Sequence, residues 1–194
     1  MLNQLEQEEI LALVKKAATP GLTTLVAMDG LTCAGKSTLA GQVADALQDA
    51  AVVDVDDFYR RLSPEECAVL GPEESYDRYF DWERLLRDVL VPLKGGSPAR
   101  YRRYDWVAGD FAEWRQIEPR GVVIVEGVYT TRAELRPYFG VMVYVDTPRD
   151  VRLARLLDRG YPDVSWVDHW MAAEDWYVEN MRPTEQVALV VHNS

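Results

Sequence analysis

Short apolar runs alternate with longer segments of mixed polarity along this chain, and the alternation predicts its secondary structure. Apolar runs of about four to eight residues, bounded by turn-forming residues, are typical of strands that a sheet buries on both faces. The runs that fit this description are predicted as strands: 22–28, 51–55, 122–127, 141–146 and 186–191. Since strands that alternate with helices form parallel sheets, we expect an α/β fold, a five-stranded parallel sheet with helices on both faces.

The segments between these runs carry apolar residues at helical spacing. Residues 2–18 have an amphipathic pattern that predicts a helix covering the sheet, and Pro20-Gly21 ends it. Further helices are predicted over 38–47, 64–70, 81–90, 148–159 and 165–181. We expect Asp81 to cap the helix over 81–90 and Pro92 to stop it, and we interpret the rest of 61–80 as loop.

The stretch Gly30-Leu31-Thr32-Cys33-Ala34-Gly35-Lys36-Ser37 follows the first strand and matches the phosphate-loop pattern G-x-x-x-x-G-K-S. Glycines let the backbone bend so that N–H groups point at phosphate oxygens, and the next helix adds positive charge at its N-terminus. Lys36 is predicted at the β- and γ-phosphates and Ser37 at Mg²⁺. The predicted nucleotide-binding residues are Gly30, Ala34, Gly35, Lys36, Ser37 and Thr38. The alternative is a glycine-rich turn that binds nothing.

Acidic residues follow two of the predicted strands. Asp56 and Asp57 come directly after the strand over 51–55, and Glu126 lies at the end of the run over 122–127. The carboxyl ends of parallel strands border the ligand crevice in open α/β sheets, so these residues are candidates for catalysis and, at Glu126, for the surroundings of Mg²⁺. A helix N-cap for one aspartate and a structural role for the glutamate are the alternatives.

Two basic segments stand out in an acidic chain. Residues 100–106 read Arg-Tyr-Arg-Arg-Tyr-Asp-Trp, and a net charge of −11 makes a small anionic or aromatic substrate a better ligand for them than RNA. A solvated hairpin is the alternative. Arg152, Arg155 and Arg159 fall on one face of the predicted helix after Pro148. Spacing leaves open whether they form an anion-binding stripe or a salt-bridged surface.

Length and composition limit the class of protein. A chain of 194 residues fits one domain, here with a short lid at about 155–165. Its acidic charge argues against a nucleic-acid surface. Cys33 and Cys67 lie in unrelated contexts, which indicates neither disulfides nor zinc and favours the cytoplasm. The acidic N-terminus is unlike a signal peptide, and no apolar run reaches the length of a membrane span.

These motifs resemble those of the uridine kinase family of phosphate-loop small-molecule kinases, which includes phosphoribulokinase-like members. The matching pieces are the Gly30–Ser37 loop, Asp56-Asp57-Phe58-Tyr59, Asp81 after Phe80, Tyr104-Asp105, Val125-Glu126-Gly127 and the arginines of 152–159. The resemblance implies the P-loop NTPase fold and the use of ATP and Mg²⁺. It also implies phosphoryl transfer to a hydroxyl of a nucleoside or similar small metabolite.

The resemblance also implies roles for particular residues. Asp56 is similar to the aspartate that accepts the proton of the attacking hydroxyl, and Glu126 to the acid that organises the water shell of Mg²⁺. Arg155 and Arg159 are similar to lid arginines that close on the ATP phosphates and act in catalysis with Lys36. The candidates for the acceptor site are Asp57, Tyr59, Asp81, Arg103 and Tyr104.

The chain departs from the family pattern where the acceptor is recognised. Uridine kinases usually carry a histidine shortly after the Tyr-Asp pair, but here the segment is 106–110, Trp-Val-Ala-Gly-Asp. Tyr161-Pro162-Asp163, followed by His169-Trp170, is loosely similar to nicotinamide riboside kinases. Arginines at 100–103 could instead hold the phosphate of a nucleoside monophosphate. The acceptor and the oligomeric state stay open.

A protein of another class, an ATP-binding module or switch with weak hydrolysis, is a further alternative. The chain lacks the Asn/Thr-Lys-x-Asp pattern of guanine specificity, and the aromatic residues and arginines between the second and third strands are typical of an acceptor site. These two features favour the kinase.

Overall fold

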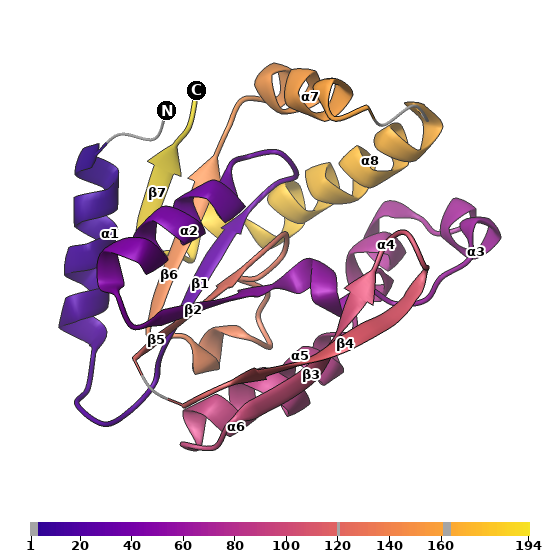
Figure 1. Cartoon of the computed structure of the whole chain (residues 1–194). Coiled ribbons are helices and arrows are strands. Elements are labelled where there is room, and N and C mark those ends of the chain that lie inside the picture. Colours follow the sequence, from indigo (N-terminus) through magenta and orange to yellow (C-terminus); the bar gives the residue numbers. More distant parts are fainter. Residues whose placement is uncertain (1–3, 120, 161–163) are drawn as a thin grey trace.

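The computed structural model describes residues 4–119, 121–160 and 164–194. A five-stranded parallel sheet with the order β2-β5-β1-β6-β7 forms its centre (Figure 1). The strands are β1 (Thr24–Gly30), β2 (Ala50–Asp54), β5 (Val122–Glu126), β6 (Val141–Asp146) and β7 (Leu189–His192). The predicted sheet is confirmed, and β1 lies in its middle, where all seven of its residues are buried.

Helices cover both faces of the sheet, as the alternation predicted. Helices α1 (Gln4–Ala17) and α2 (Lys36–Leu47) pack on one face, and α8 (Val164–Met181) lies on the other (Figure 1). Successive strand residues point to opposite faces, so Val26 of β1 contacts the first group of helices and Leu25 belongs to the core on the second side. Each strand is therefore apolar at almost every position.

A long connection between β2 and β5 carries most of the elements that the sequence pattern did not resolve. It contains η1 (Val55–Phe58), α3 (Pro64–Ala68), α4 (Pro72–Arg78), α5 (Trp82–Leu85), the π-helical turn η2 (Leu86–Leu90), α6 (Val91–Lys94), β3 (Ala99–Asp105) and β4 (Asp110–Ile117). Strands β3 and β4 pair as an antiparallel hairpin apart from the main sheet. Residues 100–105 thus lie in a hairpin, but the solvated hairpin of the alternative is not what is found, since Tyr101 and Tyr104 are buried.

Two expectations for this connection are wrong. Proline interrupts a helix when it lies in its interior, but it is well tolerated in the first turn, where Pro72 and Pro92 both lie. The segment around Pro72 is not loop but the start of α4, where Pro occupies the first turn and the Glu74 carboxylate accepts the Gly71 N–H (3.0 Å). Pro92 does not stop the helix that starts after Asp81, since helical structure continues to Lys94. Pro92 lies in the first turn of α6, after a π-helical turn, where its missing N–H is tolerated.

The C-terminal part contains η3 (Arg136–Tyr138), α7 (Arg149–Asp158) and η4 (Pro183–Glu185) besides α8 and β7. The predicted lid at about 155–165 includes residues 161–163, which lie outside the described residues, as does the Tyr-Pro-Asp segment. Among the described residues, no helix combines the length and the apolar character that crossing a membrane requires.

Candidate active site

The phosphate loop joins β1 to α2, and two glycines shape it. Gly30 has a φ of +148° and Gly35 a φ of +100°, which residues with side chains rarely adopt. A Cβ atom at Gly30 would lie 2.5 Å from the carbonyl oxygen of Val145. A Cβ atom at Gly35 would lie 2.5 Å from Nδ2 of Asn193. The loop therefore needs glycine at both positions where the motif has it.

Lys36 begins α2, and its side chain folds back over the loop. The residue is only 8% exposed, and its Nζ donates a hydrogen bond to the carbonyl oxygen of Leu31 (3.0 Å). An ammonium group has three N–H donors, so two remain for phosphate oxygens. The N-terminus of the 12-residue helix α2 adds partial positive charge, and Ser37 and Thr38 beside it are exposed. The loop thus combines positive charge with accessible hydroxyl groups.

The loop is also held from its outer side. The carbonyl oxygen of Ala34 accepts hydrogen bonds from Thr147 Oγ1 (3.0 Å) and Asn193 Nδ2 (2.7 Å). Both donors directly follow strands of the sheet, β6 and β7. The loop backbone is therefore fixed against the sheet before any ligand binds, which lowers the cost of ordering it around phosphate.

Four carboxylates lie at the carboxyl ends of β2 and β5. Asp54 ends β2, Glu126 ends β5, and the two are direct neighbours across the parallel pair of strands. Asp56 and Asp57 follow in η1. Lys36 is close enough to Asp54, Asp56 and Glu126 for its charge to lower the pKa of each. The structure therefore brings the acidic candidates from two strands next to the phosphate loop.

Crowding raises the pKa values of this acidic group. Loss of hydration raises the pKa of Asp56 to about 7, the charge of Asp54 adds to the rise, and Lys36 opposes it. Loss of hydration and Asp54 likewise raise the pKa of Glu126, while Lys36 and a hydrogen bond from Ser37 lower it. Repulsion among the carboxylates means that a cation bound beside them would be stabilised.

This arrangement fits Mg²⁺ as part of a complex with a nucleotide. The described part of the chain contains no group of three or more His, Cys, Asp or Glu side chains that could hold a metal ion by themselves. The Ser37 hydroxyl and the Glu126 carboxylate are oxygen donors, which Mg²⁺ prefers, and water and phosphate oxygens usually complete its shell in nucleotide sites. The site would therefore be finished by the ligand rather than by protein alone.

The capping alternative for Asp56 or Asp57 is wrong, because the cap of η1 is Asp54. Its Oδ1 accepts the backbone N–H of Asp56 (2.9 Å). The Asp56 carboxylate thus takes no part in capping this turn. Asp57 is buried, and its carbonyl oxygen accepts a hydrogen bond from Arg84 (2.6 Å). Loss of hydration raises the pKa of Asp57 to about 6, although Arg115 opposes the rise.

Aromatic side chains surround Tyr59, the first residue after η1. Its ring centroid lies 4.3 Å from that of Trp106 and 5.4 Å from that of Tyr104. Trp106 is 48% exposed, whereas Tyr59 and Tyr104 are buried. The hydroxyl of Tyr59 lies 3.7 Å from the Cys67 sulfur. The predicted acceptor residues Tyr59 and Tyr104 are therefore brought together, with Trp106 as the exposed part of the cluster.

Two other acceptor candidates use their charges within the protein. Asp81 caps α5 as predicted, accepting the backbone N–H of Arg84 (3.1 Å), and lies 3.7 Å from Arg60. Arg103 donates from Nε to Glu113 across the hairpin (2.9 Å). A role for either residue in binding the acceptor stays a prediction.

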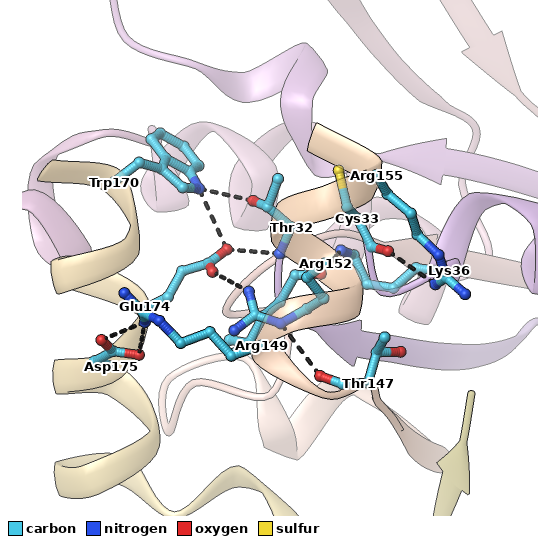
Figure 2. Close-up of polar contacts among 11 residues, drawn as sticks. Thr32, Cys33, Lys36, Thr147, Arg149, Arg152, Arg155, Trp170, Glu174 and Asp175 are labelled. Carbon is cyan, nitrogen blue, oxygen red and sulfur yellow. Dashed lines mark hydrogen bonds and ion pairs between the residues drawn. The ribbon is translucent and has the colours of Figure 1, made fainter. Parts of the chain in front are cut away.

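The three arginines that share a face of α7 have different surroundings, and Figure 2 shows two of them, Arg152 and Arg155. Arg152 is buried and forms a 2.7 Å ion pair with Glu174 of α8. Arg155 donates from NH1 to the carbonyl oxygen of Cys33 in the phosphate loop (3.2 Å). Arg159 is exposed at the end of α7, and its charge opposes the rise in the Cys33 pKa that burial causes. Spacing left two interpretations open, and Arg152 fits neither, because its ion pair is buried. Anion binding by Arg155 and Arg159 stays a prediction.

The structure adds residues that the sequence pattern did not single out. Asp54 was assigned only to a strand, although an acid that ends an apolar run is the signal that identified Glu126. Glu174 and Trp170 of α8 contact Thr32 in the loop (Figure 2). The spacing of residues along one helix could not predict these two contacts, because Thr32 lies 142 positions from Glu174 and 138 positions from Trp170.

A phosphate loop beside acidic strand ends, in a parallel sheet of this order, defines the class of P-loop nucleotide-binding folds. The family model of the phosphoribulokinase/uridine kinase family matches residues 25–193. The uridine kinase of Brevibacillus brevis is 30% identical over 185 residues, which cover 88% of this chain and 85% of that protein. The chain belongs to the phosphoribulokinase/uridine kinase family, as the resemblance predicted.

Two further comparisons agree. The uridine/cytidine kinase UKL1, chloroplastic, of Arabidopsis thaliana is 33% identical over 149 residues, or 73% of this chain, and the chain spans 30% of that protein's length. A solved structure described as a possible uridine kinase from Bacillus stearothermophilus has a TM-score of 0.76, covering 97% of this chain and 98% of that one at 23% identity. The predicted P-loop fold is thus confirmed.

Proposed function

We propose that this kinase transfers a phosphoryl group from ATP, with Mg²⁺, to a hydroxyl of a nucleoside or a similar small metabolite. The observation that carries the proposal is the arrangement of the phosphate loop after β1 with the acids at the ends of β2 and β5, where Asp54 and Glu126 are direct neighbours and Asp56 follows in η1. Phosphoryl transfer depends mainly on positioning and charge neutralisation, with a carboxylate beside the nucleophile. The site supplies both kinds of group.

The surroundings of each catalytic candidate support a particular task. Asp56 accepts the proton of the attacking hydroxyl, and its pKa of about 7 makes it a stronger base than an ordinary aspartate. Lys36 binds the β- and γ-phosphates, and Arg155, which already contacts the loop, adds positive charge next to them. Arg159 is the second lid arginine of the proposal.

The nucleotide is held by the backbone N–H groups of the loop and of the first turn of α2, from Gly30 to Thr38. Ser37 and Glu126 hold Mg²⁺ directly or through water, and the bound ion would neutralise charge on the β- and γ-phosphates. The Ser37 hydroxyl is close enough to Glu126 to lower the pKa of its carboxylate, which supports their acting together.

Contacts within the hairpin favour an uncharged acceptor with a ring over a nucleoside monophosphate. Arg100 stacks on Trp114 with 4.5 Å between its guanidinium carbon and the ring centroid, and Arg102 donates to the carbonyl oxygens of Phe111 and Ala112. With Arg103 paired to a glutamate, these arginines are engaged within the hairpin. The exposed ring of Trp106, packed on Tyr59, instead offers a surface for stacking a base.

The test is ADP release from ATP and Mg²⁺ with a panel that includes uridine, cytidine, uridine monophosphate, nicotinamide riboside and simple sugars. We expect acceptor-dependent turnover with a nucleoside and much slower turnover with its monophosphate. Asp56→Asn should reduce kcat by about a hundredfold or more, the usual effect of losing a general base, while ATP still binds. Full turnover of Asp56→Asn with the best acceptor would contradict the role of Asp56.

A nucleotide-binding module is the competing proposal from another class. Tight ATP binding without acceptor-stimulated turnover across the panel would favour it.

We further propose that residues 1–194 form one kinase domain with a short lid at about 155–165, that the protein acts on small molecules rather than nucleic acid, and that it acts in the cytoplasm. The acidic charge of −11 supports the second of these statements.

A further inference from the structure

A completely buried carboxylate lies beside the phosphate loop, outside the group of acids at the strand ends. Glu174 of α8 has no exposed surface. Its Oε1 accepts the backbone N–H of Thr32 (2.6 Å) and the indole N–H of Trp170 (3.2 Å), and its Oε2 accepts a hydrogen bond from Arg152 of α7 (2.7 Å) (Figure 2). One side chain therefore connects the phosphate loop to both C-terminal helices.

The connection continues through Arg152 to the other side of the loop. Nε of Arg152 donates to the carbonyl oxygen of Thr147 (3.2 Å), and the hydroxyl of Thr147 donates to the carbonyl oxygen of Ala34 (3.0 Å). Thr32 and Ala34 are two residues apart in the loop. Glu174 and Arg152 thus form part of one hydrogen-bonded circuit that holds the loop at both residues.

A negative charge at this place is unfavourable for a site that binds phosphates, unless it is neutralised. Arg152, 5% exposed at its side chain, supplies that neutralisation inside the protein. A buried ion pair contributes little net stability compared with apolar residues of the same size. A gain in folding stability therefore does not explain the Arg152–Glu174 ion pair, whereas a role in fixing the geometry of the site does.

The geometry that the pair fixes is that of α7. Arg155 lies three positions after Arg152, on the neighbouring turn of the same face, and donates to the carbonyl oxygen of Cys33 between Thr32 and Ala34. We infer that Glu174 is a positioning residue: by pairing with Arg152 and holding Thr32, it places Arg155 over the phosphate loop. This inference rests on the proposed function, in which the protein uses ATP and Arg155 adds positive charge next to the ATP phosphates.

The experiment measures the Kd of ATP with Mg²⁺ by calorimetry on the full chain, for Glu174→Gln, Arg155→Ala and the double variant. Glutamine keeps an oxygen that accepts from Thr32 but loses the charge that holds Arg152. We expect Glu174→Gln to weaken ATP binding about tenfold, a usual size for coupling between linked sites. Because Glu174 acts through Arg155, the same change should have almost no effect in the Arg155→Ala background.

A matched control exists on the same two helices. Arg149 of α7 and Asp175 of α8 form a 2.7 Å ion pair whose side chains are about half exposed, at 53% and 49%. Asp175→Asn should change the Kd of ATP less than about twofold, since exposed pairs contribute little, and its effect should be the same with and without Arg155.

The outcomes separate this inference from the proposed function. Failure of the unaltered chain to bind ATP would overturn both, whereas ATP binding that survives Glu174→Gln unchanged would overturn the inference alone. A merely structural role would lower the melting temperature and give equal losses with and without Arg155, which would also overturn it. If Glu174→Gln does not fold, the double variant Arg152→Met with Glu174→Gln removes both charges, and the same dependence on Arg155 is expected.

Discussion

Asp56 owes its chemistry to the residues around it. The residue is exposed to solvent, yet protein atoms packed around its carboxylate reduce its hydration. This loss of hydration and the neighbouring carboxylates raise the pKa of the side chain to about 7. Asp54 is the strongest of the charged neighbours that raise it, and Lys36 is the cation that limits the rise. Because these groups interact, the titration belongs to the group and not to one residue.

The first prediction concerns the pH dependence of the reaction. A base must be unprotonated, so kcat/KM should be at its plateau above pH 7 and should fall as the pH drops through about 7. Asp54→Asn removes a charge that raises the Asp56 pKa, so the fall should move to lower pH. A pH profile of kcat/KM for both proteins checks this, and an unchanged acid limb in Asp54→Asn would contradict the assignment.

At the scale of elements, Asp29 connects three parts of the fold that are far apart in sequence. Its carboxylate is fully buried near the end of β1. Oδ1 accepts the N–H of Gly30 (2.6 Å), and Oδ2 accepts the N–H of Thr131 (2.8 Å) and the hydroxyl of Tyr177 of α8 (2.6 Å). Burial raises the pKa of Asp29, and these hydrogen bonds oppose the rise.

We therefore predict that Asp29→Asn destabilises the protein by about 2–4 kcal/mol, because an amide N–H₂ would face donors and leave them unsatisfied in the interior. Urea unfolding followed by circular dichroism measures the difference. Asp45→Asn, an exposed change on α2, is the matched control and should stay within about 0.5 kcal/mol. Equal stabilities of the two variants would show that the buried carboxylate does not connect these elements.

At the scale of the whole molecule, the proposed phosphate site lies where five segments meet: the loop after β1, the end of β2, the end of β5, α7 and α8. A ligand that binds only the folded chain stabilises all of them together. At about a hundred times its Kd, such a ligand contributes about 2.7 kcal/mol, which for a chain of this size raises the melting temperature by about 5–10 °C.

We expect ATP with Mg²⁺ to cause this rise, and EDTA to reduce it, since Ser37 and Glu126 then lack the ion between them and the phosphates. Lys36→Ala should remove most of the rise in melting temperature that ATP with Mg²⁺ causes. In the absence of ligand, the same substitution should change the melting temperature by much less than that rise. Thermal unfolding with and without ATP, Mg²⁺ and EDTA tests the expectation. An equal rise in Lys36→Ala would contradict the proposed nucleotide site.

The elements that could be predicted from sequence are those with a strong local signal. The apolar runs of β1 and β5 and the glycines of the phosphate loop can be recognised directly from the local sequence. Helix α4 and strand β4 could not be predicted in the same way, because Pro72 is as compatible with a loop as with a helix start, and five of the eight residues of β4 are exposed. Local signals were weakest in the long connection after β2.

The sequence by itself determined the α/β architecture, the phosphate loop and the acids at two strand ends, because each depends on residues that are neighbours in the chain. Only the tertiary structure decided that Asp54 lies beside Glu126, and that of the arginines on one face of α7, Arg152 pairs with Glu174 while Arg155 faces the loop. The physical reason is that burial and pairing depend on which segments meet in space, and spacing along one helix does not contain that information.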